Sequence, residues 1–184
     1  MVPTERSSVK LINMSTLQNP SLATQLDLPG YALGIAILLL VMLVHGAALL
    51  QIAKRYEVKS FLYLSEHQHS SVAFVFYISI LCLFLTHIAE IFIWGISLWV
   101  FKLLPVLSES ILFAGSTYTA MGFMDDILPP GWKMLAIIIA FSGMFAFAWT
   151  ASVMISMTKN FRQAYTRMHM EKLNIPTEII ERFK

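Results

Sequence analysis

The sequence predicts an all-α membrane protein with three membrane-spanning helices and one shorter helix that enters the membrane without crossing it. Of the 184 residues, 57% are hydrophobic and 13% are charged, whereas an average soluble domain is about 25% charged. Three long apolar stretches follow one another along the chain. Between the second and the third lies a run of about ten residues, which as a helix would reach ~15 Å, half of a hydrocarbon core ~30 Å thick.

The three spans are bounded by charged residues, aromatic residues and prolines. Lys54 and Arg55 end the first uncharged stretch, and residues 54–71 are expected to form a polar connection. Trp94, Trp99 and Lys102 are expected to mark the outer interface. We predict the spans at residues 31–53, 72–104 and 131–157.

The short run is predicted to form a re-entrant helix at residues 108–117, capped by Ser108, followed by a loop at 118–126. Irregular backbone at membrane depth is tolerated where it is buried in protein or lines water. Gly143, near the middle of the third span, is expected to act as a hinge or to pack tightly against a neighbour. Together, residues 31–157 make one membrane domain.

Lysine and arginine set the expected orientation. Residues 54–71 carry three of them, and the basic tail at 158–184 carries six, so both segments are expected on the cytoplasmic side. The N-terminal segment, 1–30, and the loop at 118–126 are then outside. We expect a multi-pass protein of the cell's inner (plasma) membrane, in contact with the lipid bilayer.

The loop resembles the selectivity filter of potassium channels. Residues 119–125 read Thr-Ala-Met-Gly-Phe-Met-Asp, similar to the signature Thr-Thr-Val-Gly-Tyr-Gly-Asp. The lead-in at 109–119 and the follow-on Leu-Pro-Pro-Gly-Trp-Lys at 128–133 resemble bacterial ion-channel proteins with a two-transmembrane pore domain. In that group an extra N-terminal membrane helix carries His-Gly and the next carries His-x-x-Glu, matched here by His45-Gly46 and His87-x-x-Glu90.

The resemblance implies a homotetramer that passes cations passively through an axial filter. The family has Thr where this chain has Ala120, Gly where it has Met124, and Tyr where it has Phe123. We therefore expect K⁺ or another monovalent cation as the permeant ion, with altered or lost potassium selectivity. Asp125, and with less weight Asp126, would gather cations at the mouth. The filter residues implied are Thr117, Thr119, Ala120, Met121, Gly122, Phe123, Met124 and Asp125.

Three ionisable residues inside the spans form a second candidate site. His87 and Glu90 share a helix face, and counting from the span ends places His45 at a similar depth. A hydrogen-bonded pair, a divalent zinc or iron site and a proton relay all fit this pattern. A membrane metal-handling protein and a non-conducting, channel-like regulatory subunit are therefore the alternative functions.

Several other functions are not expected. The eleven Met residues allow a copper(I) hypothesis, but Met more often fills gaps in apolar cores. The sequence has no nucleophile elbow, phosphate-binding loop or Cys-x-x-Cys motif, so we do not expect an enzyme. The net charge of +2 gives no signal for nucleic acid.

Overall fold

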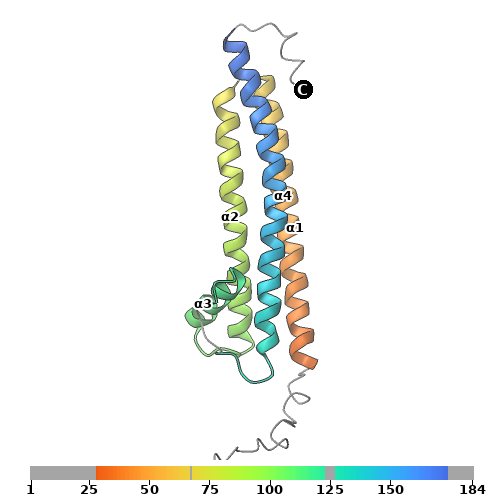
Figure 1. Cartoon of the computed structure of the whole chain (residues 1–184), viewed down its shortest axis with the longest axis vertical. Coiled ribbons are helices and arrows are strands. Elements are labelled where there is room, and N and C mark those ends of the chain that lie inside the picture. Colours follow the sequence, from red (N-terminus) through yellow and green to blue (C-terminus); the bar gives the residue numbers. More distant parts are fainter. Residues whose placement is uncertain (1–27, 67, 123–126, 174–184) are drawn as a thin grey trace, which may run out of the picture.

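Three long helices form an elongated bundle, and a fourth, short helix packs against one end of it (Figure 1). The computed structural model describes residues 28–66, 68–122 and 127–173. This part of the chain is helical and contains no strands. The helices are α1 (Leu28–Ser65), α2 (His69–Val100), α3 (Leu107–Tyr118) and α4 (Lys133–Lys172).

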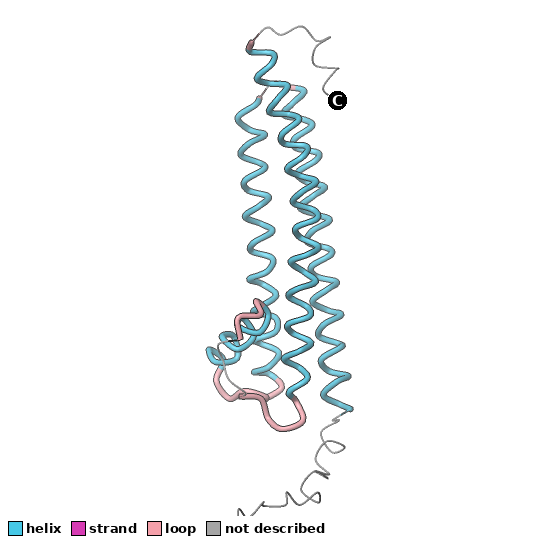
Figure 2. The backbone as a smooth tube through the Cα atoms, in the orientation of Figure 1, coloured by secondary structure: helices cyan, strands magenta, loops and turns pink. Residues whose placement is uncertain are grey.

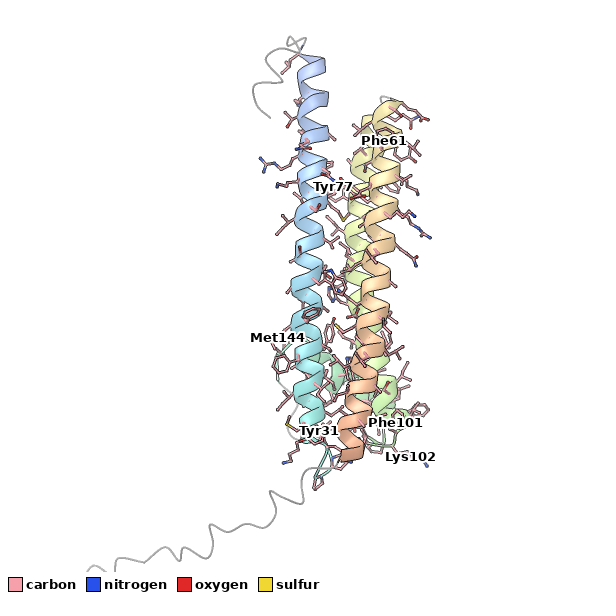
Figure 3. The ribbon with its side chains drawn as sticks, turned by 90° about the vertical axis from the view of Figure 1, so that its right-hand side faces the viewer. Tyr31, Phe61, Tyr77, Phe101, Lys102 and Met144 are labelled. Atoms are coloured by element: carbon pink, nitrogen blue, oxygen red, sulfur yellow. The ribbon has the colours of Figure 1, made fainter. Side chains whose placement is uncertain are left out.

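Helices α1, α2 and α4 are long and apolar enough to cross a membrane. Their outward faces carry large apolar side chains along the length of the bundle (Figure 3). Leu43 is 72% exposed and Phe61 is 73% exposed. Exposing such side chains to water is unfavourable, whereas exposing them to lipid is not. The prediction of an all-α fold with three helices long and apolar enough to span a membrane is confirmed for the described residues.

The polar residues after residue 53 continue α1 instead of forming a connection. Tyr56 is buried, and its hydroxyl donates a hydrogen bond to the Met157 carbonyl of α4, 3.1 Å away. Lys, Arg and Glu are good helix formers, so nothing local ends the helix there. The expected connection at 54–71 is therefore reduced to residues 66–68 between α1 and α2.

Helix α4 also runs beyond its predicted span, through much of the segment expected to be a tail. Phe161 of α4 stacks on Phe76 of α2, with ring centroids 4.5 Å apart and an interplanar angle of 8°. This contact holds α4 against the bundle past residue 157. At ~1.5 Å per residue, α4 is ~60 Å long, about twice the thickness of a hydrocarbon core.

Helix α2 ends at Val100, before the predicted boundary at 104. The Lys102 amide donates to Trp99 and the Leu103 amide to Leu98, the pair of bonds that defines a Schellman cap. Lys102 has φ +56°, so the chain turns before Pro105. Trp94, which was expected to mark the outer interface, is fully buried within the bundle, and its Nε1–H donates to the Ser142 hydroxyl at 3.0 Å.

Helix α3 is close to its predicted bounds, but its cap differs. The N-cap is Val106, without a side-chain hydrogen bond, so the prediction of Ser108 as the cap was wrong. A Cβ built on Gly95 of α2 would lie 2.8 Å from the Ile111 Cα of α3. A Cβ built on Gly143 of α4 would lie 1.9 Å from the Tyr118 carbonyl oxygen. Two glycines therefore admit the backbone of α3 between α2 and α4.

Two apolar clusters fill the bundle. One, with Trp94, Phe113 and Ile139, surrounds α3. The other, with Leu49, Phe76 and Met157, lies toward the end where α1 and α2 are connected. The loops at the α3 end appear in Figure 2 below the bundle. Along α1, α2 and α4, a layer of buried polar side chains separates the two clusters.

Candidate functional site

The buried polar layer contains all three ionisable residues singled out in the sequence. His45 lies on α1, and His87 and Glu90 lie one turn apart on α2. His45 and Glu90 are fully buried, and His87 is 6% exposed. One nitrogen or oxygen atom from each lies within 4.8 Å of those of the other two. The structure therefore brings together His45, His87 and Glu90, as their matching depths predicted.

His45 is held from two sides. Its Nδ1 lies 2.6 Å from Oε1 of Glu90, and its Nε2 lies 3.3 Å from Oγ1 of Thr150 on α4. The ring is also tilted against the Trp149 ring, with centroids 5.6 Å apart. The neighbouring Gly46 permits this approach, because a Cβ there would meet Trp149 at 2.9 Å. His45 thus links α1 to both α2 and α4.

Tyr118, the last residue of α3, completes the layer. Its hydroxyl donates to Oε2 of Glu90 at 2.5 Å and lies 2.8 Å from Nδ1 of His87. Since the phenolic proton is given to Glu90, the remaining contact is best satisfied by a proton on His87 Nδ1. The hydrogen bonds form one chain, Thr150–His45–Glu90–Tyr118–His87, and this chain joins all four helices.

Nε2 of His87 stands apart from this chain. It is buried and has no hydrogen-bond partner among the residues that the structure describes. Phe147 of α4 stacks on the His87 ring, with centroids 4.4 Å apart and an angle of 21°. With Nδ1 protonated, Nε2 carries a lone pair, and burying it unpaired is costly.

The segment after α3 begins with a helix cap. The Ala120 amide donates to Thr117 and the Met121 amide to Ser116, again a Schellman pattern. Ala120, at φ +56°, occupies the position that usually belongs to glycine, and Gly122 follows at φ +63°. Residues 119–122 are exposed, and Met121 is 73% exposed.

The predicted filter residues are only partly described. The Thr119 hydroxyl donates to the Gly115 carbonyl at 2.7 Å, so it satisfies the backbone of α3. Thr117 is half-buried on the last turn. Gly143 packs tightly against Tyr118, which matches the second of its two expected roles. Phe123, Met124, Asp125 and Asp126 lie outside the described residues.

Two members of the polar layer, Tyr118 and Thr150, were not predicted from the sequence. Tyr118 was placed in the loop rather than on the helix, and Thr150 was read as part of an apolar span. A polar side chain within an apolar run was the available signal for Thr150. For Tyr118 there was none, because its contacts depend on how α3 packs.

The fold and the site define an all-helical protein with three helices able to span a membrane and a buried polar layer that joins four helices. Compared with known proteins, the chain matches no family model, no curated protein and no solved structure.

Proposed function

We propose that this chain is the subunit of a homotetrameric pore that passes monovalent cations through a membrane. The observation that carries the proposal is the exposed backbone that follows α3. Residues 119–122 lie on the outside of the single chain, yet they follow directly from Tyr118 in the buried polar layer.

The depth of this segment follows from its neighbours on two helices. Glu90, which bonds Tyr118, lies ten residues before the end of α2. Gly143, which contacts the Tyr118 carbonyl, lies ten residues after the start of α4. Each count gives ~15 Å at 1.5 Å per residue. If α2 and α4 cross the membrane, residues 119–122 lie near the middle of its hydrocarbon core.

Such a segment is not stable in contact with lipid. The amides of Ala120 and Met121 are bonded back into α3, whereas no backbone amide in the described part of the chain donates to the carbonyls of residues 119–122. A backbone carbonyl without a partner costs several kcal/mol in hydrocarbon. Beyond the described residues, water, ions or other copies of the chain can satisfy these groups, and several copies around an axis would supply all three.

The motif resemblance then supports a cation pathway with a modified filter. Backbone carbonyls replace the hydration shell of K⁺ in potassium-channel filters, and the carbonyls of residues 119–122 accept no backbone hydrogen bond from the described residues. Ala120 lacks the hydroxyl that the family has at this position, and Met124 replaces its second glycine. We therefore infer a monovalent-cation pathway with reduced or lost preference for K⁺.

The positions of the basic residues support one orientation of the chain in the membrane. Lys54, Arg55 and Lys59 lie on the part of α1 that leads to the connection with α2, and Lys159 and Arg162 lie on the part of α4 beside it. Basic residues favour the cytoplasmic side. We infer that this end faces the cytoplasm and that the chain begins outside, in a plasma membrane.

Cation flux from proteoliposomes loaded with K⁺ tests the proposal, with Na⁺ and divalent cations as competitors. We expect flux of monovalent cations from the native chain, and a higher K⁺-to-Na⁺ ratio for Met124→Gly. Ala120→Thr is a poor companion variant, because a β-branched residue is strained at φ +56°.

The outcomes separate the alternatives. No native flux, with flux restored in Met124→Gly, would indicate a non-conducting, channel-like subunit. A strictly monomeric protein in native mass spectrometry, with no flux from either chain, would contradict the pore.

A further inference from the structure

We propose that His45, His87 and Glu90 bind one divalent transition-metal ion, zinc or iron(II), which ties α1 to α2 beside the end of α3. Two imidazoles and one carboxylate are a ligand set that these ions accept. One nitrogen or oxygen atom of each residue lies within 4.8 Å of those of the other two. Bonds of ~2.0–2.2 Å hold donor atoms roughly 3–4 Å apart, so small side-chain movements close the site.

Each of the three residues has one nitrogen or oxygen atom held by a hydrogen bond to Thr150 or Tyr118. Its other nitrogen or oxygen atom has no partner outside the cluster among the described residues. Thr150 holds Nε2 of His45 and leaves Nδ1 to Glu90. Tyr118 holds Oε2 of Glu90 and leaves Oε1 to His45. Metal-binding histidines and carboxylates are commonly oriented in this way by a partner on their other atom.

His87 follows the same pattern, and its unpartnered nitrogen is a second observation that favours a metal site. Its Nδ1 is held by the Tyr118 hydroxyl, whereas its Nε2 is buried without a partner among the described residues. The side chain is 94% buried, by difference from its 6% exposure. An imidazole lone pair in this state is satisfied by a metal ion.

Metal binding replaces the proton shared by His45 and Glu90. In the hydrogen-bonded arrangement Nδ1 and Oε1 are 2.6 Å apart, closer than two ligands of one ion usually are. Binding through Nδ1 therefore requires the imidazole proton to lie on Nε2, where the Thr150 hydroxyl can accept it, and lets Nδ1 and Oε1 separate slightly.

The composition and burial of the site define the kind of ion and its use. The three ligands offer nitrogen and oxygen and no sulfur, which favours zinc or iron(II) over copper(I). All three residues are buried between four helices. A closed site of this kind retains its ion, so the metal stabilises the packing of the helices and is not transported.

Elemental analysis of the purified full-length chain tests the proposal. The protein is incubated with ZnCl₂, or with ferrous sulfate under anaerobic conditions, and passed over a desalting column. We expect about one metal ion per chain and a higher midpoint of thermal unfolding with metal than without. Glu90→Gln and His87→Asn should each lose at least ten-fold in retained metal and lose the metal-dependent shift.

The remaining histidines provide the matched control. The triple variant His67→Ala, His69→Ala, His169→Ala removes every histidine outside the cluster and should retain the metal. Tyr118→Phe keeps all three ligands and should still bind. The proposal is overturned if the native chain retains less than about a tenth of an ion. It is also overturned if the triple variant loses the metal while Glu90→Gln keeps it.

Discussion

At Gly143 the backbone of α4 touches the backbone of α3. An added Cβ would lie 1.9 Å from the Tyr118 carbonyl oxygen and 2.8 Å from its carbonyl carbon. Neither atom belongs to a flexible side chain, so the helices themselves must separate. The residue matters here for the absence of a side chain and not for a special backbone angle.

We therefore predict that Gly143→Ala destabilises the fold by about 1–3 kcal/mol, as overpacked sites do. The midpoint of an SDS titration in mixed micelles measures the loss. Gly115→Ala is the matched control, because its Cβ would meet Ile91 at an ordinary 3.4 Å and alanine favours the helix. Equal losses in the two variants would contradict the packing argument.

Tyr118 is a second residue whose role can be isolated. Its hydroxyl contacts both Glu90 and His87, and Tyr118→Phe removes it without changing the ring. We expect a loss of roughly 1–3 kcal/mol in the free energy of unfolding, because buried polar atoms lose their partner.

The same SDS titration measures this change. Tyr77→Phe is the control, since Tyr77 is 64% exposed on α2 and should change the midpoint by less than ~0.5 kcal/mol. A Tyr118→Phe midpoint equal to that of the control would show that the hydroxyl contributes nothing to the link between α3 and α2.

At the scale of single elements, α2 and α3 end in the same way. Both close with a Schellman cap, and both place a residue with a side chain, Lys102 or Ala120, at φ +56°. Left-handed backbone costs ~1–2 kcal/mol for such residues, and glycine avoids that cost. The end of α3 is therefore held in a strained conformation.

Ala120→Gly should accordingly stabilise the chain by about 0.5–1 kcal/mol, the relief of strain less the greater flexibility of unfolded glycine. The midpoint of unfolding measures this gain in stability. Lys102→Gly should act in the same direction. Ala114→Gly, in the buried interior of α3, should instead lose about 1 kcal/mol. A loss in Ala120→Gly as large as that in Ala114→Gly would contradict the assignment of a cap.

At the scale of the whole molecule, the faces of the bundle differ in what they expose. Leu43 belongs to an outward face of α1 whose exposed side chains are apolar and whose backbone is bonded within the helix. Met121 lies in the segment 119–122, whose carbonyls accept no backbone hydrogen bond from the part of the chain that the structure describes. The first face suits lipid and the second suits an axis shared with other copies.

Site-directed cross-linking tests this difference. In a Cys82→Ser background, Met121→Cys should form disulfide-linked dimers in the membrane under mild oxidation, because copies around an axis bring the same residue close together. Leu43→Cys, which is 72% exposed on α1, should not. Efficient linking through Leu43 without linking through Met121 would place the contact between copies elsewhere.

The sequence by itself determined the class of the fold. Apolar runs longer than a bilayer is thick, and a ten-residue run between two of them, left few alternatives. It also predicted that His45, His87 and Glu90 meet, because each helix advances a fixed ~1.5 Å per residue and depth can be counted. The helix ends were harder to place: the charged residues after residue 53 are compatible with a helix, and contacts such as that of Tyr56 with Met157 decide that it continues.

The tertiary structure alone decided that Tyr118 and Thr150 join the polar layer and how α3 is held. Trp94 reads as an interfacial residue in sequence, yet the Ser142 hydroxyl of a distant helix lets it be buried. Tyr118 reaches Glu90 because Gly95 and Gly143 let α3 approach α2 and α4 closely. Such contacts depend on the rotation and separation of helices, which hydrophobic periodicity constrains weakly in chains that are apolar on nearly every face.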